Sequence, residues 1–279
     1  MRPARASSRS RALLIAALFG FAFLYIPIAS LIIYSFNESR LVTVWSRFSV
    51  RWYGELFRDP QILSAAWLSI RIAFTSATLA LVLGTIAAVV LTRFGAFRTR
   101  TILTGLATAP LVMPEVVTGL SLLLLFVTLQ GVIGWPDGRG FTTIVIAHAT
   151  FGMAFVAVVV QSRLLDMDRV LEEAAMDLGA GPVRTFFDVT LPVIAPSLVA
   201  GWLLAFTLSL DDLVIASFVS GPGSSTLPMV IFSKVRLGVS PDVNALATLM
   251  ILVVAIGVAL AFYLSRIYER RLSENGKRA

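Results

Sequence analysis

The sequence EEAAMDLGAGPVRTFFDVTLP, from Glu172 to Pro192, decides how the rest of this chain is interpreted. It is charged and amphipathic, whereas most of the chain is apolar. Gly179 and Gly181 favour the end of a first helix, because glycine adopts left-handed conformations without a Cβ penalty. Pro182 suits the first position of a second short helix, and Pro192 is expected to close that helix. We therefore predict a helix–turn–helix shape within residues 163–192, which we call the elbow, suited to dock onto something outside a bilayer.

The composition is that of an integral membrane protein. Hydrophobic residues make up 57% of the 279 residues, charged residues make up 14%, and the mean hydropathy is +0.87, whereas soluble domains are about 25% charged. Spans of about 20 residues leave no room for a separate soluble catalytic domain. With no cysteine and one histidine, disulfides, thiolate metal sites and multi-histidine sites are excluded. The net charge of +7 lies in tails and short loops, so a nucleic-acid partner is not expected.

The apolar runs predict a single domain over residues 1–279 with six transmembrane helices. These helices are expected over residues 12–35, 65–92, 101–129, 141–162, 193–219 and 244–265. Of the 23 Lys and Arg residues, 15 fall in the two tails, the 93–100 loop and the elbow, and 8 fall on the other side. Because cytoplasmic loops carry such an excess of positive charge, both termini and the elbow are expected in the cytoplasm.

Three acidic residues fall inside the predicted spans, which is costly unless they face a cavity or a partner. At 1.5 Å per residue, Glu115 lies about 21 Å along the third span, and Asp211 and Asp212 lie about 27 Å along the fifth. All three are expected in the outer half of the bilayer, where they would suit a cationic substrate. The alternatives are that the aspartates are solvated at the boundary and that Glu115 pairs with Arg71 or a backbone group. His148, in the fourth span, is interpreted as a hydrogen-bonded packing residue rather than a ligand.

The elbow also resembles the EAA loop of ABC-importer permeases, whose pattern is Glu-Ala-Ala, three residues, Gly, nine residues, Ile, any residue and Leu-Pro. The matching residues are Glu173, Ala174, Ala175, Gly179, Val189, Leu191 and Pro192. The spacing is kept throughout, and Val189 in place of Ile is the single departure. The alternative is an ordinary cytoplasmic loop with a glycine turn. In the family, this loop sits in a groove of a cytoplasmic ATPase and transmits its closure to the membrane helices.

Nearly the whole chain is similar to the permease subunits of polyamine ABC importers, and of putrescine systems in particular. The resemblance is carried by residues 41–45, 51–56, 109–116, 172–179 and 209–223. It implies an all-α protein of the bacterial inner membrane with the type I, MetI-like permease fold. It also implies an ATPase-coupling role for the elbow residues Glu173, Ala174, Ala175, Gly179, Leu191 and Pro192, and a substrate path along Glu115, Asp211 and Asp212. Position 115 is Asp in some relatives, which keeps the charge.

The partners that the resemblance implies are a second, homologous permease, two cytoplasmic ATPase subunits, a periplasmic substrate-binding protein and membrane lipid. ATP and magnesium would belong to the ATPase subunits, because this chain has no Gly-x-x-x-x-Gly-Lys-Ser/Thr loop with which to hold ATP. The chain is expected to bind no cofactor and to catalyse no reaction by itself.

Other functions stay open at this point. An importer permease for spermidine, an amino acid, iron or an anion would share the architecture, although the three acids argue against an anion. The cargo itself is not fixed by this sequence, because specificity in such systems largely resides in the binding protein. A secondary transporter or channel would show paired internal repeats and would have no need of a docking elbow. A membrane-embedded enzyme is disfavoured by the lack of clustered ligands.

Overall fold

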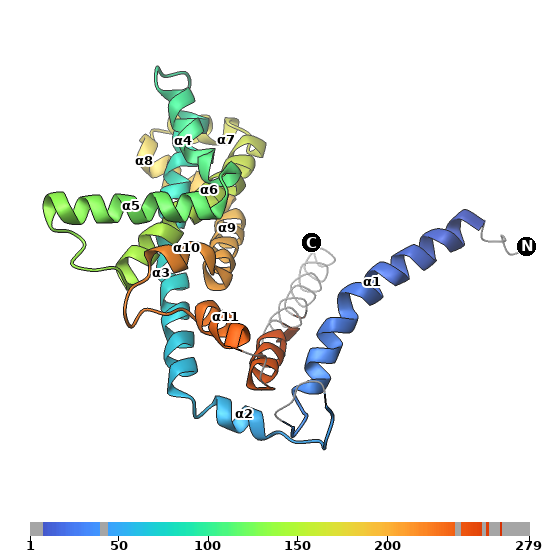
Figure 1. The fold of residues 1–279 in the computed structure, drawn as a ribbon. Coiled ribbons are helices and arrows are strands. Elements are labelled where there is room, and N and C mark those ends of the chain that lie inside the picture. Colours follow the sequence, from blue (N-terminus) through green and yellow to red (C-terminus); the bar gives the residue numbers. More distant parts are fainter. Residues whose placement is uncertain (1–7, 40–43, 238–240, 253–254, 257–262, 264–279) are drawn as a thin grey trace, which may run out of the picture. The chain divides into compact units, whose positions relative to one another are not determined.

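The computed structural model of the chain describes residues 8–39, 44–237, 241–252, 255–256 and 263, and over these residues the chain is all-α (Figure 1). Outside the helices, the β-type pairing within this part is an isolated bridge between Asn37 and Phe48. The all-α prediction is therefore confirmed. The helices are α1 (Ser8–Tyr34), α2 (Arg51–Leu56), α3 (Pro60–Arg93), α4 (Arg100–Val112), α5 (Glu115–Ile133), α6 (Phe141–Asp166), α7 (Val170–Asp177), α8 (Pro182–Thr185), the π-helix η1 (Phe186–Thr190), α9 (Leu191–Asp211), α10 (Val214–Val219) and α11 (Leu227–Leu237).

Within the described residues, five helical segments are long and apolar enough to cross a membrane. They are Leu13–Tyr34, Pro60–Arg93, Glu115–Ile133, Phe141–Asp166 and Pro182–Asp211. A shorter apolar helix, Pro241–Leu252, begins close to the start of the predicted sixth span over 244–265. Much of the rest of that span, residues 253–254, 257–262 and 264–265, lies outside the described residues.

Two of the predicted spans are interrupted. The helix expected over 101–129 is split into α4 and α5, because Met113 has the extended backbone (φ −76°, ψ 135°) that a following proline favours. The helix expected over 193–219 ends at Asp211, where Asp212 turns to φ −65° and ψ 125° before α10 begins. Both interruptions place an acidic residue, Glu115 or Asp211, at the broken end of a helix.

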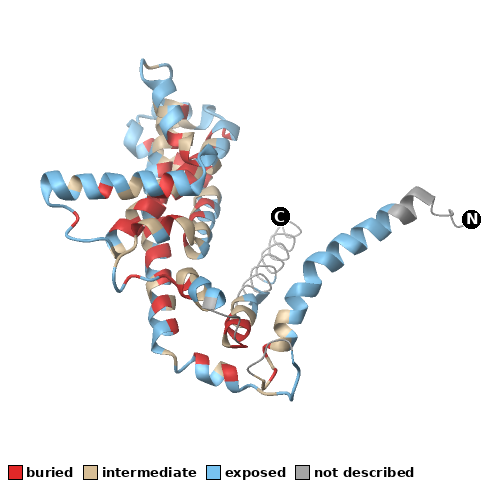
Figure 2. Ribbon diagram, in the orientation of Figure 1, coloured by how far each residue is buried: buried red, intermediate tan, exposed pale blue. Residues whose placement is uncertain are grey.

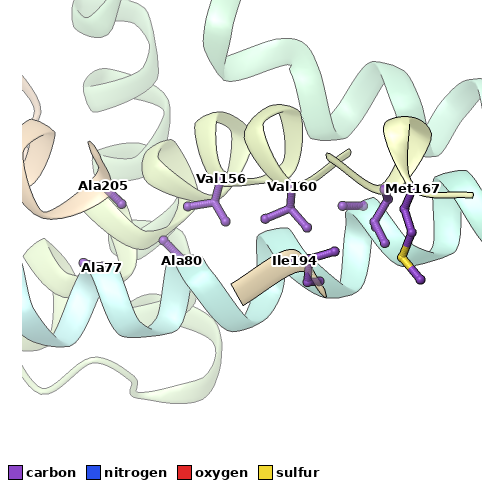
Figure 3. Packing of buried hydrophobic residues seen from close by; sticks show 9 residues of the cluster. Ala77, Ala80, Val156, Val160, Met167, Ile194 and Ala205 are labelled. Carbon is purple, nitrogen blue, oxygen red and sulfur yellow. The ribbon is translucent and has the colours of Figure 1, made fainter. Parts of the chain in front are cut away.

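The chain divides into two compact units, residues 61–232 and residues 1–60 with 233–279. The larger unit has its core where α3, α6 and α9 meet. Small and branched side chains fill this core, which is closed at one end by the buried Met167 (Figure 3). The members of the cluster are Ala77, Ala80, Ala88, Val156, Val160, Leu164, Met167, Ile194 and Ala205. Small residues of this kind let membrane helices approach closely.

Helices α3 and α6 approach closely at Gly84. A Cβ atom at this position would lie 2.7 Å from the carbonyl oxygen of Met153 and 2.8 Å from the Cβ of Val156. A second cluster joins α3, α5, α6 and α10 around the buried side chains of Ile72, Phe126 and Ile144. These contacts pack together the helices of the 61–232 unit, which includes the elbow.

In the other unit, α1 is exposed along most of its length (Figure 2). A helix that is apolar on every side is one that lipid or a neighbouring protein covers. The same unit holds an ion-pair cluster in which Lys234 binds Asp242 at 2.9 Å and Asp59 at 3.0 Å. Burial lowers the pKa of Lys234, but the hydrogen bonds and charges of the two aspartates outweigh burial and raise that pKa above its ordinary value of 10.5.

Candidate functional site

The elbow is built as the sequence predicts at its turn. Helix α7 ends in a left-handed Gly179 (φ +89°), whose N–H donates to the carbonyl of Met176 at 2.9 Å. The N–H of Ala180 donates to the carbonyl of Ala175 at 3.0 Å, so the last carbonyls of α7 are satisfied within the turn. Pro182 then opens α8, as expected from its missing N–H.

The expectation that Pro192 closes the second helix is wrong. The helical run continues from Pro182 to Asp211, because η1 is inserted between α8 and α9. In this π turn the N–H of Leu191 donates to the carbonyl of Phe186, five residues earlier. The wider turn makes room for the ring of Pro192, which would clash with the carbonyl of residue 188 in a regular α-helix. Leu191 and Pro192 therefore lie in the first turn of α9, where the elbow continues directly into a long helix.

One carboxylate joins the elbow to the membrane helices. The Oε2 atom of Glu172 lies 2.8 Å from Nε of Arg93 at the end of α3, and both side chains are largely buried, 13% and 15% exposed. The Oε1 atom of Glu172 accepts a hydrogen bond of 2.6 Å from the hydroxyl of Thr190 in η1. One turn earlier, Arg169 donates to the carbonyl of Thr92 at 2.8 Å. Within the elbow, α7 is thus held on α3 at two points and on η1 at one.

A cleft of about 430 Å³ lies between the elbow and the end of α3, and Arg93 and Glu172 of the bridge line it. Its lining includes Val89 and Phe94 on one side and Met176 and Phe186 on the other. The cleft leaves free volume beside the ion pair, so the elbow is not packed tightly against α3 along its full length.

The opposite side of the elbow presents apolar side chains to the surroundings. Leu178 is 90% exposed and Val183 is 71% exposed, and they flank the glycine turn. Of the motif residues, Glu173, Ala174 and Gly179 are exposed and Ala175 is half-buried.

The structure separates the two aspartates that were predicted together. The side chain of Asp212 is 8% exposed, and its carboxylate accepts hydrogen bonds from the backbone N–H groups of Ile215 (3.3 Å) and Ala216 (2.7 Å) in the first turn of α10. Asp211 and Glu115 are both exposed. Two of the three predicted acids are therefore accessible, while the third holds the start of a helix.

Asp212 is also the end of a buried polar chain that crosses from α3 to α10. Nε2 of His148 lies 3.1 Å from Oδ2 of Asp212, and Nδ1 lies 2.7 Å from the hydroxyl of Ser209. The Ser209 hydroxyl in turn accepts from Ser76 at 2.9 Å. The geometry is that of Nε2–H donating to the carboxylate and of Nδ1 accepting from Ser209. His148 lies in a satisfied hydrogen-bond network, as the sequence interpretation expects.

The proposed pairing of Glu115 with Arg71 is not formed in the described part of the chain. The guanidinium of Arg71 instead lies over the ring of Phe141, 5.0 Å from its centroid. Glu172, Arg93 and Ser209 were missed by the sequence interpretation. A serine in an apolar span is a weak signal of a polar contact, but nothing local distinguishes Glu172 from its neighbour Glu173.

Comparison of this sequence with known protein families and proteins finds transport permeases. The family described as "Binding-protein-dependent transport system inner membrane component" matches residues 80–274. The chain is 60% identical over 262 residues to the "Putrescine transport system permease protein PotI" of Escherichia coli (strain K12), covering 94% of this chain and 93% of that protein. It is 42% identical to the "Spermidine/putrescine transport system permease protein PotC" of Haemophilus influenzae, covering 88% of this chain and 93% of that protein.

Among solved structures, the fold is similar to a chain in the crystal structure of a bacterial ABC transporter that imports the acidic polysaccharide alginate. The TM-score is 0.71 at 17% identity, covering 94% of this chain and 99% of that chain. This likeness confirms the predicted type I, MetI-like permease fold. The chain belongs to the family of binding-protein-dependent transport system inner membrane components, and its predicted place in the bacterial inner membrane, as a multi-pass protein, is confirmed.

Proposed function

We propose that this chain is the membrane-spanning permease subunit of an ATP-driven importer that carries a polyamine, putrescine first of all, from the periplasm to the cytoplasm. The observation that carries the transport mechanism is the elbow, which has an exposed apolar side and a buried bridge to the membrane helices. The cargo is supported by the 60% identity to a permease named for putrescine over 94% of this chain.

The proposed complex contains this chain, a second homologous permease, two cytoplasmic ATPase subunits and a periplasmic substrate-binding protein. The family description, which names a binding protein, supports the last of these. ATP and magnesium would be held by the ATPase subunits, and this chain would bind no cofactor. Both termini would lie in the cytoplasm, following the excess of Lys and Arg in the tails and the elbow.

In this proposal, Leu178 and Val183 seat the elbow on an ATPase subunit through their exposed apolar surfaces. Glu173, Ala174 and Ala175 of α7 and Gly179 of the turn would belong to the docked part of the elbow, and Leu191 and Pro192 would carry its movement into α9. Closure of the ATPase dimer on ATP would displace the elbow, and the membrane helices would change from inward-facing to outward-facing. The subunit's contribution would be mechanical, with ATP hydrolysed in its partners.

The substrate path would run past Glu115 and Asp211, the exposed acids at two helix breaks. Putrescine carries an ammonium group at each end at neutral pH, since alkyl ammonium groups have a pKa of about 10.4. Two accessible carboxylates at interrupted helices would offer such a dication charge compensation in the membrane. Asp212, included in the predicted path, would support it indirectly by holding α10.

The test is uptake of labelled putrescine into vesicles that contain the complete complex and its binding protein. We expect ATP-dependent uptake that unlabelled putrescine competes strongly, spermidine more weakly, and a neutral amino acid not at all. Asp211→Asn should reduce uptake, whereas Asp188→Asn, an exposed acid on the elbow, should leave it unchanged. If another solute were taken up and putrescine were not, the permease would stand and the proposed cargo would be wrong.

A second candidate cargo is spermidine, which is supported by the 42% identity to a spermidine/putrescine permease. Uptake of labelled spermidine and labelled putrescine, measured in the same vesicles, separates the two. If spermidine is the main cargo, its KM for uptake should be lower than that of putrescine.

A further inference from the structure

Glu172 is the residue at which three elements of the 61–232 unit meet. Its two carboxylate oxygens are used separately, Oε2 by Arg93 of α3 at 2.8 Å and Oε1 by Thr190 of η1 at 2.6 Å. Glu172 itself belongs to α7. A single side chain therefore connects α7 to the end of α3 and to η1, which leads directly into α9.

The surroundings of this carboxylate shield its ion pair from water. The side chains of Glu172 and Arg93 are 13% and 15% exposed, so water screens their attraction much less than it screens a surface pair. Removing one partner would leave the other charge largely buried and unpaired, which is costly. By contrast, the elbow's other ion pair, Arg184 with Asp188, is 78% and 62% exposed and lies within one stretch of helix.

A second contact holds the same side of α7 to α3. Arg169, three residues before Glu172, donates to the carbonyl of Thr92 at 2.8 Å. This carbonyl is one of the last of α3, which have no partner within the helix. Residues three apart share one side of a helix, so Arg169 and Glu172 together orient α7 toward α3, and the cleft of about 430 Å³ beside them leaves room for a change of angle.

Leu178 and Val183, on either side of the glycine turn, are 90% and 71% exposed, whereas Glu172 lies beside the cleft. The elbow thus has an outer side for a partner and an inner side whose polar contacts converge on Glu172.

We propose that Glu172 is a positioning residue for transport: through its bridge to Arg93 and Thr190, displacement of the elbow reaches α3 and α9. This inference rests on the proposed function, because it assigns the path by which the same elbow drives the membrane helices. Without the bridge, the elbow would still dock on the ATPase and would still continue into α9, but α7 would turn within the cleft and its movement would no longer be passed to α3.

The experiment uses the complete complex in vesicles and measures two quantities, the ATP hydrolysed and the putrescine transported, so that their ratio reports coupling. Glu172→Gln removes the charge but keeps an oxygen that can accept from Thr190. Arg93→Gln removes the other charge, and Arg93→Lys restores it. Arg184→Gln breaks the exposed ion pair on the same elbow and is the matched control.

We expect Glu172→Gln and Arg93→Gln each to lower the putrescine transported per ATP by about fivefold to tenfold, with ATP hydrolysis continuing, as for a typical coupling between two sites. The double variant should be no worse than the more affected single variant, because both changes break one pair. Arg93→Lys should restore much of the ratio, and Arg184→Gln should change it less than twofold, as expected of a surface pair of little energetic weight.

An unchanged ratio in Glu172→Gln, or an equal loss in Arg184→Gln, would overturn the inference. A purely structural role would lower the amount of assembled complex, and with it both rates, at a constant ratio. If Glu172→Gln does not assemble, the comparison of Arg93→Lys with Arg93→Gln gives the same test. A wild-type complex that transports no putrescine with ATP would instead refute the proposed function.

Discussion

Replacement of Gly179 by alanine tests whether the elbow depends on its left-handed turn. Gly179 has φ +89°, and a Cβ atom added there would meet nothing within 4 Å. The cost of Gly179→Ala is therefore conformational and not steric, and a left-handed residue with a Cβ costs about 1–2 kcal/mol. That free energy corresponds to a change of about 5–30-fold in the population of the turn.

The assay is hydrogen exchange on the purified complex in lipid. The amides of Gly179 and Ala180 donate to the carbonyls of Met176 and Ala175 within the turn, so they exchange when the turn opens. In Gly179→Ala, both amides should exchange about 5–30-fold faster, with stimulation of ATP hydrolysis reduced alongside. Gly179→Asn should fall between wild type and Gly179→Ala, because asparagine tolerates the left-handed region better than alanine.

Gly181→Ala is the matched control two residues away. Its position is equally open, but its φ of −72° and ψ of 162° suit alanine before a proline. We expect no change in exchange at 179 and 180 in this variant. Equal acceleration in both variants, or none in Gly179→Ala, would refute the claim that the left-handed turn forms the elbow.

Three further predictions concern the acids of the proposed substrate path, the packing of the 61–232 unit and the ion pairs of Lys234 in the other unit. Asp211→Asn should raise the KM for putrescine uptake with little change in kcat, and a KM equal to that of the wild type would exclude Asp211 from the path. Asp212→Asn should instead lower the free energy of unfolding of the complex by about 1–3 kcal/mol, because it disturbs a buried hydrogen-bonded group. Gly84→Ala should destabilise by about 1–3 kcal/mol through overpacking against α6, whereas Gly131→Ala, in open space on α5, should not; thermal unfolding in detergent compares them. Because the pKa of Lys234 is raised in the folded state, its ion pairs should stabilise the folded state fully below pH 10.5 and lose this effect only as the pH rises through the higher pKa of the folded protein. The free energy of unfolding of a Lys234→Met variant should therefore lie below that of the wild type by the same amount throughout the neutral range. A difference that became smaller between pH 7 and about 9 would contradict the raised pKa.

Local patterns were sufficient for the elements that depend on neighbours in sequence. Gly179 and Pro182 encode the turn between α7 and α8, and apolar runs mark the five long apolar helices of the described residues. The prediction from Pro192 was wrong, because it assumed a regular α-helix, which a proline interrupts. The π turn over residues 186–190 accommodates the proline ring without ending the helix. Sequence periodicity at 3.6 residues does not encode a single wider turn.

The side-chain contacts between distant parts of the chain could not be predicted from the sequence. Nothing local links Glu172 to an arginine at the end of α3, and His148 meets Ser209 across 61 positions of the chain. Such pairs depend on which sides of two helices face each other, which packing decides. The same holds for the separate roles of the adjacent residues Asp211 and Asp212, since a break in a helix turns neighbours in different directions.

In the proposed complex, this subunit couples ATP hydrolysis to putrescine import through the docked elbow. The most direct measurement is the ATPase activity of the complete complex in vesicles, with the binding protein either empty or loaded with putrescine. We predict that the loaded protein stimulates hydrolysis and that Leu178→Asp, at a side chain 90% exposed and outside the core, removes the stimulation, whereas the neighbouring Asp177→Asn keeps it. Stimulation by putrescine that persists unchanged in Leu178→Asp would contradict the elbow as the docking element, and no stimulation in wild type would contradict the account as a whole.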